Sequence, residues 1–295
     1  MGGLAALRTA AGAELSGPPT AREVRRLCEA HGIAPSRRRG QNFVVDPNTV
    51  RRVVARAGVG PGDLVAEIGP GLGGLTLALV EAGAEVVAVE VDAGLVRALG
   101  EVLADTDGVT LHHADALEVD WAALLGGRSA LLVANLPYHL ATPLVIGALE
   151  SGCFGRLEVM VQREVGERWT ATAGHPAFSA ASLRVAARAE AHIDGRVSRN
   201  AFLPVPGVDS VTVRLEPRAW TFDVARERVL DLVTIGFAQR RKRLRNALRA
   251  GGLSPAAIDT AFAATGLGAD VRAEEVDLAG WVALARGLPA TAPPA

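Results

Sequence analysis

Asn135, Leu136, Pro137 and Tyr138 follow an apolar run and carry groups that suit a planar aromatic amine. An amide oxygen and a main-chain carbonyl can together accept hydrogen bonds from both protons of such an amine. Pro137 removes one main-chain donor and leaves carbonyls free to accept. The tyrosine ring can stack on the base. The tetrapeptide therefore predicts a site that aims an amino nitrogen at a reactive group, although a turn with an asparagine cap and a core tyrosine is the alternative.

A glycine-rich turn at 67–76, "EIGPGLGGLT", lies between an expected strand and an expected helix. Gly69 and Gly71 let the backbone approach a ligand closely, and the helix start offers free amides. Such a turn suits a dinucleotide, S-adenosylmethionine or only a tight bend. Pro70 sits between Gly69 and Gly71. Glu90, about 20 residues on, ends the next strand, where a carboxylate can accept both ribose hydroxyls. Together these features favour S-adenosylmethionine as the ligand of the turn. They also favour a ligand-binding role for Glu90 over that of a solvated strand end.

Asp115 ends a third strand, where an acceptor can take the exocyclic amino group of adenine. It also reads as the N-cap of a helix over 116–125. Ligands of open α/β sheets bind beyond the carboxyl ends of the strands. Gly69, Glu90, Asp115 and Asn135 are all expected at such ends, so we expect them to converge on one ligand. The reaction would be an in-line methyl transfer in which positioning supplies most of the catalysis.

Short strands and helices alternate over the first two thirds of the chain, which predicts an α/β fold with a parallel sheet covered on both faces. Two further strands, at 183–194 and 209–217, follow without an intervening helix and predict an antiparallel pair that closes the sheet. A seven-stranded, mostly parallel sheet of this kind is the Rossmann-like fold of class I methyltransferases. The five strands expected before that pair are 64–69, 85–91, 109–115, 129–136 and 156–162.

The chain divides into four expected regions: a flexible leader at 1–19, a catalytic domain at 20–217, a small all-α domain at 218–288 and a disordered tail at 289–295. Helices are predicted from Thr20 to about His31 and from Asp46-Pro47 onward, because both starts carry capping residues. In the second domain, helices are predicted at 224–252, 254–266 and 277–288.

The net charge of −1 argues against binding nucleic acid through bulk charge. Two dense basic clusters nevertheless predict contacts to phosphates, although each cluster also reads as a solvated face. The two cysteines have no metal-ligand spacing, so we expect free thiols and no metal. No apolar run reaches the roughly 20 residues that span a bilayer, which predicts a cytoplasmic protein. The clustered basic residues are Arg37, Arg38, Arg39, Arg240, Arg241, Lys242, Arg243 and Arg245.

The ordered motifs resemble those of the ribosomal RNA adenine N6-dimethyltransferases over roughly residues 20–285. The motifs are "RRRGQNFVVD", "EIGPGLGGLT", "VEVD", "ADAL", "NLPY", "FLPVPGVDS" and "RRKRLRNAL". The resemblance implies that Gln41, Asn42 and Val44 cover the methionine end of S-adenosylmethionine. It implies donor binding by Gly69, Glu90, Asp115 and Asn135. It also implies that Phe202 sandwiches the target adenine opposite Tyr138.

Within this family, "GQNF", "NLPY" and "RRKRLRNAL" look most like the enzymes that dimethylate two adjacent adenosines in the 3′-terminal hairpin of 16S rRNA. The expected partner is then a precursor of the small ribosomal subunit, and we expect the protein to bind it as a monomer. Gly207 and Arg243 stand where a basic residue and a threonine are common. Three alternatives remain: a paralogue that methylates 23S rRNA and confers antibiotic resistance, a non-catalytic assembly factor, and a methyltransferase for DNA or a small molecule.

Overall fold

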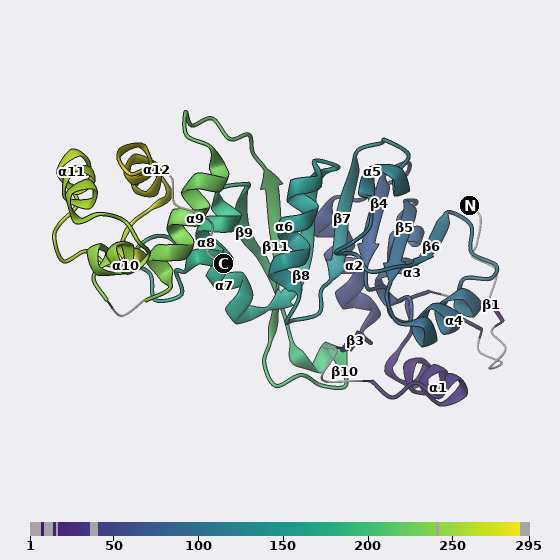
Figure 1. Ribbon diagram of the computed structural model, residues 1–295. Coiled ribbons are helices and arrows are strands. Elements are labelled where there is room, and N and C mark those ends of the chain that lie inside the picture. Colours follow the sequence, from purple (N-terminus) through teal and green to yellow (C-terminus); the bar gives the residue numbers. More distant parts are fainter. Residues whose placement is uncertain (1–6, 9–13, 16, 36–40, 240–241, 290–295) are drawn as a thin grey trace. The chain divides into compact units, whose positions relative to one another are not determined.

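The computed structural model describes residues 7–8, 14–15, 17–35, 41–239 and 242–289 (Figure 1). The chain forms two compact units. The first comprises Met1–Gly166 and His192–Pro217, and the second comprises Glu167–Ala191 and Arg218–Ala295. The sequence placed one boundary near Pro217. The structure adds the segment before His192 to the helical unit. No helix in the described part of the chain is long and apolar enough to cross a membrane.

A seven-stranded sheet in the order β6-β5-β4-β7-β8-β11-β9 carries the first unit. Its first five strands pair in parallel, and β11 pairs antiparallel with β8. The predicted class I methyltransferase sheet, seven-stranded and mostly parallel, is therefore confirmed. The strands are β4 (Leu64–Ile68), β5 (Glu85–Glu90), β6 (Val109–His113), β7 (Ala130–Asn135), β8 (Phe154–Gln162), β9 (Ala189–Val197) and β11 (Ser210–Pro217).

Two short antiparallel ribbons lie outside this sheet. β1 (Leu7–Arg8) pairs with β2 (Glu14–Leu15), and β3 (Phe43–Val44) pairs with β10 (Phe202–Leu203). In the second ribbon Leu203 faces Phe43 and Phe202 faces Val44. This pairing brings the segment after residue 41 against a segment far along the chain, which no local sequence pattern indicated.

The central strands are buried because helices cover the sheet. All five residues of β4 are buried, as expected for a parallel strand with both faces covered. The predicted helix starts are confirmed: Glu23 accepts from the amide of Thr20 at 2.7 Å, and Asp46 accepts from the amide of Asn48 at 3.1 Å. The helices are α1 (Ala21–His31), α2 (Pro47–Ala57), α3 (Gly74–Glu81), α4 (Ala93–Val102), α5 (Trp121–Leu124), α6 (Ala141–Ser151) and α7 (Arg163–Thr170).

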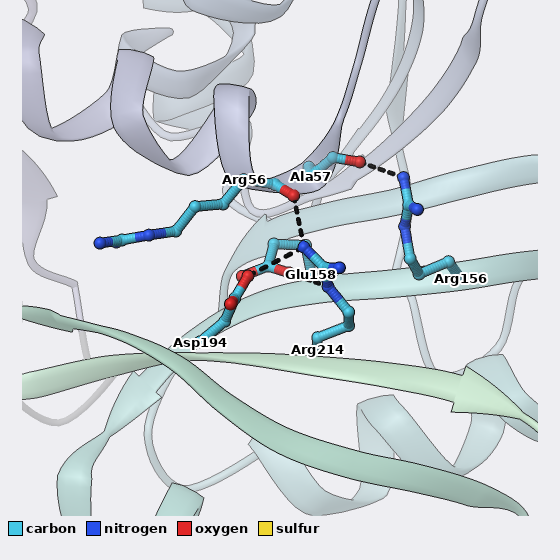
Figure 2. Close-up of polar contacts among 6 residues, drawn as sticks. All are labelled: Arg56, Ala57, Arg156, Glu158, Asp194 and Arg214. Carbon is cyan, nitrogen blue, oxygen red and sulfur yellow. Dashed lines mark hydrogen bonds and ion pairs between the residues drawn. The ribbon is translucent and has the colours of Figure 1, made fainter.

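Two arginines of the sheet donate hydrogen bonds to the last turn of α2, as Figure 2 shows. Arg214 of β11 donates through Nη2 to the carbonyl oxygen of Arg56 at 2.6 Å, and Arg156 of β8 donates to the carbonyl of Ala57. These bonds satisfy carbonyls that the last turn of a helix leaves without partners. Buried Glu158 lies 3.5 Å from Nε of Arg214, and burial raises the pKa of this carboxyl to about 6. The contacts fix α2, which follows directly on β3.

The second unit is helical and packs around Trp281, Phe262 and Leu244, all fully buried. Two predictions were partly wrong here. Residues 189–194 of the strand expected at 183–194 do lie in β9, but residues 183–186 belong to α8, where Leu183 packs into the helical core. The helix expected at 224–252 is broken into α9 and α10. The helices are α8 (Ala180–Ala186), α9 (Arg226–Phe237), α10 (Leu244–Ala250), α11 (Pro255–Thr265) and α12 (Leu278–Gly287), with short 3₁₀ turns η2 (Arg199–Ala201) in the first unit and η3 (Ala273–Glu275) in the second.

Candidate active site

A cavity of about 250 Å³ lies at the carboxyl ends of β4, β5 and β7. This is the edge at which ligands of open α/β sheets bind. The structure brings most of the residues proposed for the donor and acceptor to its walls. The predicted residues that line it are Gln41, Asn42, Val44, Gly69, Gly71, Glu90, Asp115, Asn135 and Pro137.

The glycine turn after β4 depends on left-handed backbone geometry. Gly69 has φ 67° and Gly71 has φ 59°, values that side chains rarely allow. A Cβ on Gly71 would lie 3.0 Å from Cδ1 of Phe43. The turn therefore favours glycine at both positions for conformation, and at Gly71 for space as well.

Glu90 is buried and held by main-chain donors. The amide of Asp92 donates to Oε1 at 2.9 Å, and the amide of Gly71 donates to Oε2 at 3.3 Å. Burial raises the pKa of Glu90, and the two amide bonds oppose that rise. The carboxyl group is thus fixed in one orientation at the cavity wall, where its remaining lone pairs can accept ligand hydroxyls.

Gln41 reaches the cavity from the segment before β3. Its Nε2 donates to Oδ2 of Asp92 at 3.4 Å. Asp92 in turn caps α4, since its Oδ1 accepts from the amide of Gly94 at 2.8 Å. Asp92 was not among the predicted site residues. Asp92 links Gln41, in the segment before β3, to α4, the helix that follows Glu90.

Glu67 is a second residue that the sequence reasoning missed. It lines the cavity, is only 1% exposed, and its Oε2 accepts from Oγ1 of Thr76 at 2.7 Å. Burial raises the pKa of Glu67 to about 8, with Glu90 adding repulsion. The raised pKa favours the protonated, neutral form of this carboxyl. A charged residue in the otherwise apolar stretch "LVAEIG" was the available signal.

Asp115 lies exposed at the rim of the cavity, after β6. Its Oδ1 accepts from the amide of Leu117 at 2.9 Å, which closes a local turn. The long helix that it was also expected to cap is absent from this stretch. Asp120 instead caps α5, accepting from the amide of Ala123 at 3.1 Å.

The tetrapeptide after β7 is split between cavity and core. Asn135 is half-buried and donates through Nδ2 to the carbonyl of Asn42 at 3.0 Å, which leaves Oδ1 as its acceptor. Leu136 is buried, and its amide donates to the carbonyl of Met160 at 3.0 Å. This main-chain bond holds the turn against β8. Leu136 therefore positions its neighbours and does not line the cavity.

Tyr138 is half-buried beside β11. Its hydroxyl lies 3.4 Å from Oγ of Ser210, a residue that the predictions did not name. Burial raises the pKa of Tyr138, so the phenol is neutral. The following residue, His139, is exposed and lines the cavity. Ser210 ends the motif "FLPVPGVDS", which was the only sequence signal for it.

Phe202 does not lie where the sandwich of the target base would need it. It is 1% exposed and packs in the core below β3, opposite Val44 in the β3–β10 ribbon. The pairing of β10 with β3 turns the ring inward. In this structure Phe202 packs against β3, and its buried ring presents no free face to a base.

Five of the eight predicted RNA-binding residues, Arg37, Arg38, Arg39, Arg240 and Arg241, lie outside the described residues. Lys242 is exposed. Nε of Arg243 lies 3.0 Å from Oδ1 of Asp270, and Arg245 pairs with Asp259 while its guanidinium lies 4.4 Å from the centre of the Phe262 ring. Acidic neighbours thus already neutralise two of the three described cations.

No group of three or more histidine, cysteine or acidic side chains suited to a metal occurs among the residues that the structure describes. Cys28 and Cys153 are free thiols. Within this part of the chain, the polar atoms that line the cavity belong to carboxylates, amides, the imidazole of His139 and main-chain groups. Such groups suit the hydroxyls and amines of a nucleoside.

Comparison with known proteins agrees with this site. The family model for ribosomal RNA adenine dimethylase matches residues 35–288. The ribosomal RNA small subunit methyltransferase A of Leifsonia xyli is 44% identical over 89% of this chain and 96% of its own length. The protein of the same name from Streptomyces avermitilis is 42% identical over 86% of this chain and 88% of its own.

Two solved structures share the fold. The crystal structure of the 23S rRNA methyltransferase ErmE has a TM-score of 0.64 at 25% identity, covering 84% of this chain and 99% of that protein. A dimethyladenosine transferase from Plasmodium falciparum has a TM-score of 0.66 at 21% identity, covering 82% of this chain and 95% of that protein.

Proposed function

The chain belongs to the ribosomal RNA adenine dimethylase family, and on that premise we propose that it dimethylates N6 of two adjacent adenosines in the 3′-terminal hairpin of 16S rRNA. The methyl donor is S-adenosylmethionine and the partner is a precursor of the small ribosomal subunit. Relatives named ribosomal RNA small subunit methyltransferase A, 40–44% identical over 85–94% of this chain, support this target.

The donor occupies the cavity at the carboxyl edge of the sheet. Glu90 accepts from the ribose hydroxyls, with both carboxyl oxygens already oriented by main-chain amides. Asp115 stands at the rim for the adenine amino group, and Gln41 and Asn42 cover the methionine end from the segment before β3. Glu67 lines the same cavity, and its raised pKa favours the protonated form, which adds no charge against the donor carboxylate.

The acceptor adenine enters next to Asn135. Oδ1 of Asn135 and the carbonyl of Pro137 accept the two N6 protons, so the nitrogen lone pair leaves the ring system and points at the sulfonium methyl. Nitrogen forms a bond to the methyl carbon while the carbon–sulfur bond breaks, and the thioether leaves. The cationic nitrogen then releases a proton to water. No strong base is required before the attack, because the proton on the resulting cationic nitrogen is acidic, and positioning supplies most of the catalysis.

The target adenine must leave its helix to reach such a site. Tyr138 then stacks on the flipped base. The neutral phenol, held near Ser210, keeps the ring in one orientation. Phe202 is left out of this account, since its ring lies in the core. The small-subunit target is preferred to the 23S target of ErmE because that protein is only 25% identical.

The observation that carries this proposal is the convergence of Glu90 and Asn135 on one cavity. The test is to incubate the protein with labelled S-adenosylmethionine and small subunits that lack the two dimethyladenosines. We expect label in 16S rRNA and primer-extension stops at two adjacent adenosines, since N6-dimethylation blocks pairing. Large subunits are the control. Label found only in 23S rRNA would move the target to that of ErmE, and no label in either rRNA would support a non-catalytic assembly role.

A further inference from the structure

We propose that the outer face of helix α1 is a second contact site for rRNA, at which Arg22, Arg25 and Arg26 bind phosphates that flank the target adenosine. The inference rests on the proposed function, since it extends the same substrate beyond the reacting base. None of the three arginines belongs to the basic clusters that the sequence singled out.

The spacing places the three arginines together. Positions 22, 25 and 26 are three and four residues apart and share one side of an α-helix. All three are exposed, whereas Val24 and Leu27 on the opposite side are fully buried. The helix is capped at both ends, by Thr20 with Glu23 and by Gly32. The face is therefore a fixed array and not part of a flexible arm.

The charges of this face are mostly unneutralised. In the described part of the chain, no acidic side chain pairs with Arg22, Arg25 or Arg26. Glu29 is the one exposed acid of α1, on the same side as the arginines, and the half-buried Glu23 accepts hydrogen bonds from Thr20 and keeps its charge. Three positive charges thus share the helix with two negative charges, of which one is exposed.

Two other exposed arginines of the first unit, Arg51 and Arg128, do have acidic partners. Arg51 pairs with Glu81 at 2.9 Å, and Arg128 pairs with Glu85 at 2.5 Å. A positive array that lacks acidic partners within a chain of net charge −1 suits a polyanion better than a protein surface of mixed charge.

The position of α1 connects this face to the active site. Pro19 and Val24 line the donor cavity, and in Figure 1 α1 lies at the same end of the first unit as β3 and β10. Leu203 at the end of β10 packs with the helix, and six residues separate it from Ser210, the neighbour of Tyr138. The segment from Leu203 to Ser210 thus connects the neighbour of Tyr138 to α1 along the chain.

A second cavity, of about 330 Å³, lies beside the arginines. Its walls are Arg25, Cys28, Glu29, Pro35, Leu203 and Pro204. None of these residues has an aromatic ring on which a base could stack; Arg25 is the cation in the wall that a phosphate would meet, and Glu29 opposes it. The geometry accordingly points to backbone contact, which positions RNA without reading its sequence.

The experiment compares three variants of the full chain for binding to a 16S rRNA hairpin fragment at several salt concentrations. The variant Arg22→Ala with Arg25→Ala and Arg26→Ala should bind on the order of ten-fold or more weakly. Its salt slope should fall by about 2 to 3, roughly one per lost phosphate contact. Glu29→Gln should bind more tightly, a gain that a merely structural role would not produce. Arg128→Ala should match the unaltered protein.

S-adenosylmethionine affinity and the thermal midpoint serve as controls and should stay unchanged in all three variants. An unaltered affinity and salt slope in the triple variant would overturn the proposal. A loss seen only with protein-containing subunits, and not with the RNA fragment, would assign the face to a ribosomal protein and also overturn it. The unaltered protein is also tested for methylation of small subunits. Failure of the proposed function would appear there, as absent methylation, separately from the binding results.

Discussion

The donor cavity and the helical unit both hold charged residues that the sequence singled out, but they hold them in opposite ways. At the cavity, Glu90 is buried and receives two main-chain amides, so its free lone pairs are left for a ligand. In the helical unit, Arg243 and Arg245 meet Asp270 and Asp259. A charge held by backbone remains available to a ligand, whereas a charge held by an opposite charge is largely committed to the fold.

The largest effect that would test this comparison is expected at Asn135. Asn135→Ala removes the acceptor Oδ1 and should lower methyl transfer by at least about a hundred-fold, the scale seen when one preorganised polar group is lost. Donor affinity, measured by calorimetry, should change little, because Glu90 and the glycine turn remain. Asn135→Asp keeps an acceptor oxygen but loses the Nδ2 bond to Asn42. It therefore separates the acceptance of the adenine amine from the contact with the segment before β3. Unimpaired turnover in Asn135→Ala would remove this residue from the mechanism.

A smaller effect is expected at Glu67, through pH. Burial raises the pKa of its carboxyl to about 8 from an ordinary value near 4.5. Between these values the folded chain holds a proton that the unfolded chain has lost. The free energy of unfolding should therefore fall as pH rises through this window, by up to about 1.4 kcal/mol per pH unit.

Glu67→Gln cannot ionise and should flatten that dependence, as measured by urea unfolding from pH 5 to pH 8. Glu85→Gln is the matched control. Glu85 is exposed and Arg128 lowers its pKa, so it is ionised in both states throughout the window. An unchanged slope in Glu67→Gln would show that Glu67 is already charged in the folded protein.

The smallest effects should distinguish two cations of the helical unit. Arg245→Ala loses the contact with the Phe262 ring and the bond to Asp259, and should lower the free energy of unfolding by about 1 kcal/mol. Its RNA salt slope should stay the same. Lys242→Ala should leave stability within about 0.5 kcal/mol and reduce the slope by about 1. The reverse pattern would mean that Arg245 faces RNA.

The parts of the site that sequence predicted are those built locally. Gly69, Glu90, Asp115 and Asn135 each follow a strand, and parallel pairing brings strand ends to one edge. The contacts that sequence missed join distant segments: Asn135 meets Asn42 across 93 positions, and Tyr138 meets Ser210 across 72. No periodicity encodes such pairings. The interior position of Phe202 follows from one of them, the β3–β10 ribbon.

The discontinuous make-up of the helical unit bears on how the chain emerges during synthesis. Phe178 and Leu183 belong to a core completed by Val229, Leu232 and Trp281, which are translated later. Until those residues appear, α8 has no apolar surface to pack against, although the sheet strands on either side of it can already associate. A protein truncated at Pro217 would keep this exposed stretch permanently. We therefore expect such a fragment to aggregate, whereas a fragment that also lacks residues 167–191, bridged by a short linker, should remain dispersed.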